Sequence, residues 1–215
     1  MLKGVEQSSV SIYDEISECL LRDSDCLDCL PPDWDLKKLG DVLKLEYGKP
    51  LEKDRRKDDG IYPAYGANGV KCRTDECYWD KPSIIIGRKG SAGEVNLAED
   101  AFWPLDVTYF VIFDENEYDL LFIYYCLKNL RLQTLAKGVK PGINRNDVYE
   151  IECPFPKLPE QKRIVKYVGI LQAKIDELRV LNQERLEGLS EFNQSVLQNA
   201  FSGGISASST RDRKA

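Results

Sequence analysis

The C-terminal stretch from residue 159 to residue 201 has no proline after Pro159, and its core positions recur in a strict four-three spacing. Pro159 suits the first position of a helix and Ser202-Gly203-Gly204 ends the stretch, which predicts a helix roughly 64 Å long at ~1.5 Å per residue. Eight of the ten core positions are apolar, and the ten are Ile164, Val168, Leu171, Ile175, Leu178, Asn182, Arg185, Leu189, Phe192 and Val196. This spacing is typical of a coiled-coil seam, which one helix cannot bury on itself. The seam therefore predicts a partner helix, unless the helix lies across its own domain.

A second copy of the chain is the simplest partner for this seam, because a closed twofold dimer is the commonest way to bury one exposed surface. We expect residues 160–201 of the two copies to pack antiparallel. The register that sets a positions against d positions pairs apolar residues along the seam: Leu178 with Leu189, Ile175 with Phe192, and Leu171 with Val196. It also sets Asn182 against Arg185, and a polar layer of this kind fixes the register at some cost in stability. Pairing with another half-length chain and packing on a different subunit are the alternatives.

The composition excludes several classes of protein. The chain has 215 residues and no histidine, which rules out Ser-His-Asp catalysis, Cys-His catalysis and histidine-ligated metal sites. Its net charge of −6 is unlike that of a globally basic nucleic-acid binder, although phosphate binding depends on local charge. No apolar run reaches the ~20 residues that a membrane span needs. Residues 1–30 carry seven acids and two bases, unlike a signal peptide, so we expect a cytoplasmic protein with reduced cysteines.

Pattern and charge divide the chain into four parts, which are an acidic N-terminal extension (1–30), a globular domain (31–157), the long helix (158–204) and a flexible tail (205–215). Within the globular domain, residues 83–86 and 107–113 are β-branched or aromatic runs that predict strands. Residues 120–135 carry apolar side chains at helical spacing, and glycine-rich loops lie between these elements. Strands and a helix without regular alternation predict an α+β fold with a mixed β-sheet, followed by the long helix.

Four stretches stand out in chain order. They are Trp34 to Gly48, Ile61 to Gly69, Ile84 to Gly93 followed by Phe102-Trp103 and Asp106, and Lys140 to Asp147 leading into Cys153 to Val165. Each alone is a weak signal, because glycine-rich loops are common. Together, and ending in a long helix, they resemble one half of the DNA-specificity subunit of type I restriction–modification systems. The resemblance covers about residues 34 to 204.

The resemblance implies a target-recognition domain joined to a conserved long helix. A complete subunit of that family holds two such units, whose helices pack antiparallel as a molecular ruler, whereas this chain holds one. It also implies recognition of double-stranded DNA without catalysis, with methyltransferase subunits docked on the scaffold and motor–nuclease subunits able to join. S-adenosylmethionine, ATP and Mg²⁺ would then belong to those partner subunits. A truncated remnant, or a coiled-coil adaptor that does not bind DNA, is the alternative.

Local basic clusters are the candidates for DNA contact, because Arg and Lys bind phosphates and guanine while Asn binds adenine. The candidates are Lys53, Arg55, Arg56, Lys57, Asn68, Lys71, Arg73, Arg88, Lys89, Lys137, Lys140, Asn144 and Arg145. The stretch around Arg88 resembles one shared across the family, so Arg88 can be scaffold, and residues 53–57 and 71–78 are better candidates for base reading. Asn68 can instead occupy a positive-φ turn position. Each of these charges can also be an ordinary solvated surface residue.

Signals for catalysis and metal binding are weak. Leu30-Pro31-Pro32-Asp33 lacks the polar residue and the aromatic residue of an amino-methyltransferase loop. Glu160-Gln161-Lys162 has the letters of a nuclease motif but no strand to present them. Cys26-x-x-Cys29 and Cys72-x4-Cys77 could together form a structural zinc site, but a set of small buried thiols is the simpler interpretation. We therefore expect no catalytic residue and no metal site.

Overall fold

The computed structural model describes residues 31–139 and 141–201. The N-terminal extension, Lys140 and the predicted tail lie outside the described residues. The chain divides into two compact units, residues 1–165 and residues 166–215. The first unit holds the strands and the short helices, and the second holds most of one long helix.

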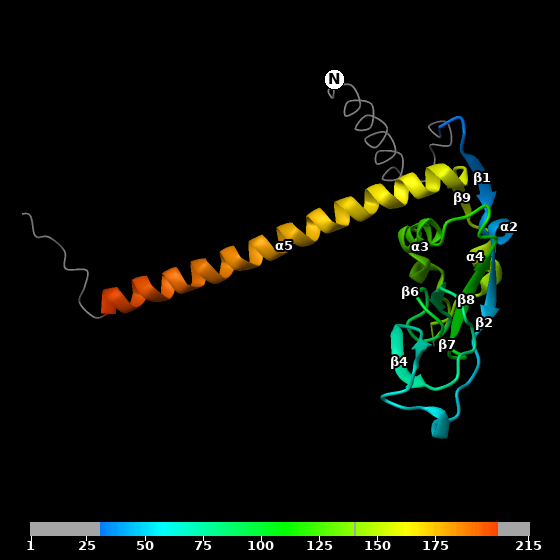
Figure 1. Ribbon diagram of the computed structural model, residues 1–215, viewed down its shortest axis with the longest axis horizontal. Coiled ribbons are helices and arrows are strands. Elements are labelled where there is room, and N and C mark those ends of the chain that lie inside the picture. Colours follow the sequence, from blue (N-terminus) through cyan, green and yellow to red (C-terminus); the bar gives the residue numbers. More distant parts are fainter. Residues whose placement is uncertain (1–30, 140, 202–215) are drawn as a thin grey trace, which may run out of the picture. The chain divides into compact units, whose positions relative to one another are not determined.

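The elements follow in the order β1 (Asp35–Lys38), α2 (Leu39–Val42), β2 (Leu43–Tyr47), η2 (Lys53–Arg55), β3 (Tyr62–Gly66), β4 (Gly69–Thr74), β5 (Ser83–Gly87), β6 (Val95–Ala98), β7 (Trp103–Pro104), β8 (Thr108–Phe113), α3 (Leu120–Asn129), η3 (Leu132–Leu135), α4 (Arg145–Tyr149), β9 (Glu152–Phe155) and α5 (Leu158–Phe201). Three sheets result (Figure 1). One is antiparallel in the order β2-β8-β5-β6, one is mixed in the order β4-β3-β7 with β3 parallel to β7, and one is the pair β1-β9. The predicted α+β fold with a mixed sheet is confirmed.

Strand β5 lies at the centre of the first unit. Because side chains alternate between the two faces of a strand, Ile84 and Ile86 pack in the cluster that includes residues of α3, while Ile85 packs with Phe102 and Phe110 on the other face. All three isoleucines are fully buried, and each such burial stabilises the fold by roughly 1.5–3 kcal/mol. The strand predicted at 83–86 is therefore present and buried on both sides.

The helix predicted at 120–135 is shorter than expected. Helix α3 ends at Asn129, Arg131 adopts a left-handed conformation with φ of 47°, and η3 follows. Leu132 in η3 is fully buried. The break redirects the chain so that Leu132 enters the core, which a continuous helix would not allow at its spacing from Leu127 and Ile123.

Helix α5 is one unbroken element of 44 residues, and its first turns belong to the first unit. Gln161 is fully buried, and Ile164 and Val165 pack against the large core cluster. Ile164, which the sequence placed in a dimer seam, therefore packs against its own domain instead. Every side chain from residue 169 to residue 201 is exposed.

Among the described residues, no helix combines the length and the apolar character that crossing a bilayer would require.

Candidate nucleic-acid interface

Three glycine-rich loops of the first unit lie together, and we call them the loop junction: residues 66–69, residues 87–93, and residues 137–145 apart from Lys140. A Cβ added to Gly87 would lie 2.8 Å from the carbonyl oxygen of Ala67 and 2.1 Å from that of Ser91, so only glycine allows this close approach. The second and third loops are hydrogen-bonded to each other. Ile143 N donates to the carbonyl of Arg88 at 3.0 Å, and Gly90 N donates to that of Pro141 at 3.2 Å. Two stretches that carried the sequence resemblance therefore form one structural feature.

Arg88 is anchored in the junction, and no acidic residue of 31–139 and 141–201 forms an ion pair with it. Its backbone N–H donates to Val107, and its Nη2 donates to the carbonyl oxygen of Asp106 at 2.6 Å. Its Nε is buried and has no hydrogen-bond partner in the structure. No carboxylate of the described residues balances the guanidinium, so Arg88 has both a scaffold role and an unpaired charge beside the loops.

The other predicted residues of the junction differ in what they contact. Lys137 pairs with Asp147 at 2.7 Å, while Lys89 is exposed. The side chain of Asn144 accepts a hydrogen bond from Asn146 N and caps α4. The cap uses one of the two acceptor positions of that oxygen and fixes its direction, so Asn144 is less free to read a base than an uncapped amide. Lys140 lies outside the described residues.

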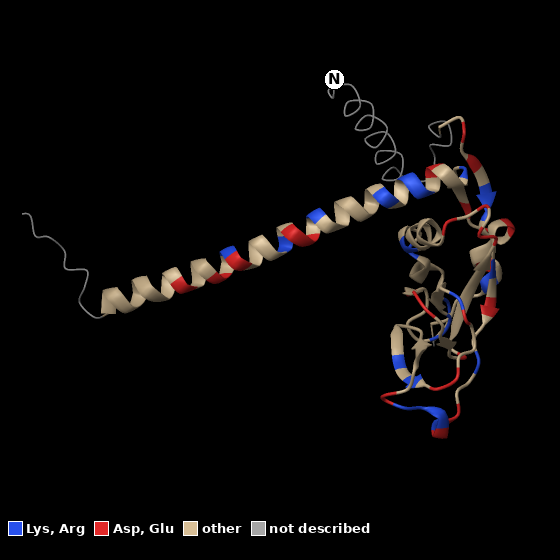
Figure 2. Ribbon diagram, in the orientation of Figure 1, with Lys and Arg blue, Asp and Glu red and all other residues tan. Residues whose placement is uncertain are grey.

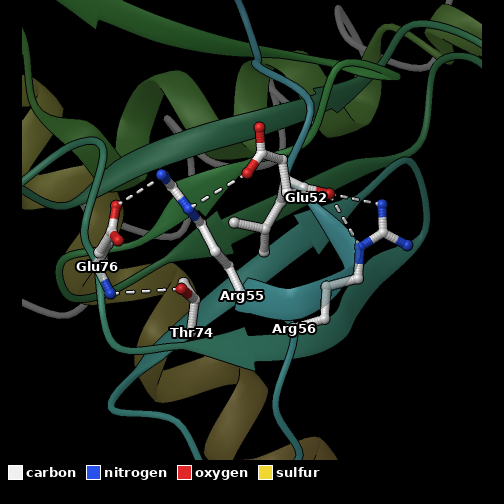
Figure 3. A network of polar contacts seen from close by, with 6 residues as sticks. Glu52, Arg55, Arg56, Thr74 and Glu76 are labelled. Atoms are coloured by element: carbon white, nitrogen blue, oxygen red, sulfur yellow. Dashed lines mark hydrogen bonds and ion pairs between the residues drawn. The ribbon is translucent and has the colours of Figure 1, made fainter.

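A second basic group lies around η2 and the adjoining end of β4, and its charges are largely used within the domain. Arg55 contacts Glu76 at 3.1 Å and Glu52 at 3.7 Å (Figure 3). Arg56 donates twice to the carbonyl oxygen of Leu51. Figure 2 shows acidic residues interspersed with the basic ones in this part of the chain.

Lys57 and Arg73 complete this group. Lys57 pairs with Asp75, and Arg73 donates to the carbonyl oxygens of Gly60 and Ile61. The pair holds the pKa of Asp75 below its ordinary value, mainly through the hydrogen bond from Lys57. The sequence favoured residues 53–57 and 71–78 for base reading, but most of their basic side chains already bind groups within the domain. In the first segment, Lys53 is exposed and has no such contact among the described residues.

Asn68 and Lys71 lie on the β3–β4 hairpin, with Asn68 in the first loop of the junction and Lys71 in the strand that follows it. The positive φ of the turn falls on Gly69, at 104°, and not on Asn68, so the turn interpretation of Asn68 is wrong. Asn68 is exposed. The stem of Lys71 lies over Gly66, where a Cβ would come within 2.6 Å of it. This hairpin therefore presents one amide and one amine beside the junction.

Two tyrosines support the junction, and the sequence interpretation missed both. Tyr47 ends β2, and its ring lies 5.1 Å from that of Tyr109. Tyr109 donates to the carbonyl oxygen of Ile143 at 3.1 Å. Burial, reinforced by its hydrogen bond with Tyr47, raises the pKa of Tyr109 to about 12. The available signal was an aromatic residue at a strand end directly before Gly48, within a stretch that carried the resemblance.

The motifs considered for catalysis and metal binding have structural roles or lie outside the described residues. Glu160 pairs with Arg163 at 2.7 Å, and Gln161 is buried in hydrogen bonds at the start of α5. Cys72 and Cys77 are free thiols, and Cys26 and Cys29 are outside the described part. Over residues 31–139 and 141–201, no group of three or more Cys, Asp or Glu side chains is placed to hold a metal ion.

Sequence comparison adds an independent observation. A family model described as the type I restriction modification DNA specificity domain matches residues 31–187. The chain is similar to a type I specificity subunit of Mycoplasma pneumoniae, with 33% identity over an alignment of 157 residues that covers 69% of this chain and 41% of that protein. It is also similar to the type I restriction enzyme EcoDI specificity subunit of Escherichia coli, with 24% identity over 82% of this chain and 39% of the other.

Solved structures of the same kind share the fold. An S subunit of a type I restriction–modification system from M. genitalium has a TM-score of 0.61 and 27% identity, over 75% of this chain and 44% of that one. The HsdS subunit from Thermoanaerobacter tengcongensis has a TM-score of 0.63 and 20% identity, over 93% of this chain and 52% of that one. The chain thus spans about two fifths of the length of these curated relatives and about half of the second solved chain.

Proposed function

Because the chain belongs to the family of type I restriction modification DNA specificity domains, we propose that residues 31–157 bind double-stranded DNA sequence-specifically, as the recognition part of a type I restriction–modification assembly. The observation that carries the proposal is the loop junction. Three loops from distant parts of the sequence meet there and present Arg88, Lys89 and Arg145 beside exposed glycine backbone. Guanidinium groups, amines and backbone amides are the groups that bind phosphate oxygens.

Base reading needs side chains with free donors and acceptors at the edge of such a surface. Asn68 and Lys71 on the β3–β4 hairpin meet this condition, and Lys53 is a further candidate near η2. An amide can bind adenine in two places, and an amine can bind guanine. We assign phosphate contact to Arg88, Lys89 and Arg145 of the loop junction, and base contact to Asn68 and Lys71 of the hairpin.

The charge of the domain supports specific rather than nonspecific binding. Residues 31–157 carry 19 bases and 22 acids. Counterion release by basic residues supplies most of nonspecific affinity, so we expect weak binding to DNA without the target sequence. Binding then depends on the local arrangement of a few cations and on base contacts.

The assembly that we propose around the domain follows from the exposed helix. The seam positions of α5 beyond its first turns are 40–64% exposed where apolar, as at Leu171, Leu178 and Phe192. We propose that the seam from Val168 to Val196 pairs antiparallel with a second copy, or with another half-length specificity chain, and that methyltransferase and motor–nuclease subunits join this scaffold. The chain itself has no catalytic role in this proposal, and the cofactors belong to those subunits. Its cysteines stay reduced in the cytoplasm.

A coiled-coil adaptor that does not bind DNA is the second candidate, and the exposed apolar row of α5 together with the net charge of −6 favours it. A gel shift with the full chain and a random-sequence 40-base-pair duplex at low salt, followed by selection of the bound sequences, separates the two. DNA recognition predicts a retarded band that weakens as salt rises and whose DNA becomes enriched in one sequence motif. An adaptor predicts no retarded band at any salt concentration, even at tens of micromolar protein.

A further inference from the structure

Two arginines from separate loops converge on the ring of Tyr47. The guanidinium carbon of Arg88 lies 5.3 Å from the ring centroid, and that of Arg145 lies 5.2 Å from it. Tyr47 itself is 44% exposed, so the group lies at the surface. Both distances are within the range of cation–π attraction, which favours Arg over Lys because the planar guanidinium can stack on the ring.

The backbone around this group is fixed by hydrogen bonds. The Tyr109 ring packs on Tyr47 and its hydroxyl donates to Ile143, whose N–H in turn donates to the carbonyl of Arg88. The hydrogen bond from Arg88 to Asp106 holds the guanidinium from a further direction. The two loops therefore cannot move independently of the ring, and both guanidinium groups are held before any ligand arrives.

Charge distinguishes this pair from the other candidate arginines. Arg55 is matched by Glu52 and Glu76, whereas within residues 31–139 and 141–201 neither Arg88 nor Arg145 has a carboxylate within ion-pair distance. Two cations held on one ring repel each other, and an anion between or beside them would remove that repulsion. Arg88 already donates one N–H of Nη2 to Asp106 and its Nε is buried, so it has fewer donors left for bidentate guanine reading than a free guanidinium. The remaining donors suit single contacts to phosphate oxygens.

We propose that Tyr47 is a positioning residue that holds Arg88 and Arg145 as a two-arginine clamp on the sugar–phosphate backbone of one DNA strand. The inference rests on the proposed function and adds to it the residue that orders the phosphate contacts. The clamp carries no sequence information, so it sets the register of the domain on DNA and leaves base reading to the β3–β4 hairpin.

The test is the salt dependence of DNA binding by the full chain, measured by fluorescence anisotropy with a labelled mixed-sequence 40-base-pair duplex. Arg88→Gln and Arg145→Gln should each reduce the slope of log K against log salt by about 0.9, the value for one phosphate contact. Tyr47→Leu should reduce the slope by at least as much and weaken binding severalfold, although it removes no charge. Tyr47→Phe should keep the slope and the affinity of the wild-type chain, because it keeps the aromatic ring.

The matched control is Lys81→Gln, which also removes one positive charge. Lys81 precedes the start of β5, whereas Arg88 follows its end, so the two charges lie at opposite ends of that strand. It should leave the slope unchanged. Thermal melting checks that each variant is folded. If Tyr47→Leu does not fold, Arg145→Lys replaces it, since it keeps the charge but removes the stacked plane and should also bind more weakly.

Three results would overturn the clamp. Unchanged slopes in both arginine variants, with DNA binding by the wild-type chain intact, would show that neither arginine contacts a phosphate, and would not contradict the proposed function. Reduced slopes in the arginine variants with wild-type behaviour of Tyr47→Leu, or of Arg145→Lys in its place, would remove the positioning role. Absence of binding to this mixed-sequence duplex by the wild-type chain, even at low salt, would overturn the clamp, whereas sequence-specific recognition is decided by the selection of bound sequences.

Discussion

Gln161 shows how one buried polar residue holds the start of the long helix in its domain. Its Oε1 accepts from Asp119 N at 2.8 Å, and its Nε2 donates to the carbonyl oxygens of Pro156 at 2.8 Å and Glu117 at 3.1 Å. The amide oxygen and the amide nitrogen of Gln161 thus both have partners, and the side chain has no exposed surface. Removing it would leave three backbone groups without their partner.

Gln161→Ala should therefore destabilise the fold by about 2–4 kcal/mol, because buried unsatisfied groups cost more than a lost hydrogen bond. Urea unfolding measures this free energy. Gln172→Ala is the matched control, since Gln172 bonds only to Asp176 on the exposed part of α5. A loss below about 0.5 kcal/mol for Gln161→Ala, the range of ordinary surface substitutions, would contradict the role assigned to it.

Tyr109 makes a prediction for alkaline pH. Burial raises its pKa to about 12 in the folded protein, while an unfolded tyrosine titrates near ~10. Above pH 10 the unfolded state loses this proton first, so the free energy of unfolding falls as pH rises from about 10 to 12. Tyr109→Phe should be less sensitive over that window when both proteins are unfolded in urea at a series of pH values. Equal slopes for the two proteins would show that the hydroxyl is not protected.

Single residues also mark the limit of sequence interpretation. The sequence located every basic cluster but could not say which charges were free. Lys57 and Arg55 meet Asp75 and Glu76 only because β3 and β4 fold back on each other, and that contact is not local. Tyr47 was missed for the same reason, since its two arginines come from distant loops.

At the scale of elements, the heptad spacing was the most reliable signal. It predicted a helix from Pro159 to the glycines at 203–204, and α5 runs from Leu158 to Phe201. The helix predicted at 120–135 was only partly right, because burial of Leu132 overrides helical spacing at Arg131. A periodic pattern reports which residues are apolar, but tertiary packing decides where the backbone must turn.

The same helix carries the assembly prediction. Leu178→Asp places an unpaired charge in the proposed seam and should convert a dimer into a monomer in light scattering at tens of micromolar. Val180→Asp is a close control, because Val180 is as exposed as Leu178, at 58% against 59%, and lies at an outer position of the heptad. The control should remain dimeric. A strictly monomeric wild-type chain would end the homodimer proposal, and dimerisation that survives Leu178→Asp would show that the seam or its register is wrong.

At the scale of the whole molecule, the described residues form one globular unit and one long helix, and the chain spans 41% of its Mycoplasma pneumoniae relative. A twofold pair of such chains would place two identical recognition domains on one scaffold. Two identical domains related by a twofold axis read an inverted repeat, and the pairing of the helices would set the spacing between its halves. The target that we expect is therefore an interrupted palindrome.

Selection of bound sequences from a random duplex library is the most direct test of sequence-specific recognition by this chain. The full chain, with a type I methyltransferase subunit present, would be incubated with the library at physiological salt, and the bound DNA sequenced over successive rounds. Recognition by a twofold pair predicts enrichment of one short motif, present as two inverted copies at a fixed separation. Enrichment of no motif, with the chain folded and the methyltransferase bound, would contradict sequence-specific recognition by residues 31–157.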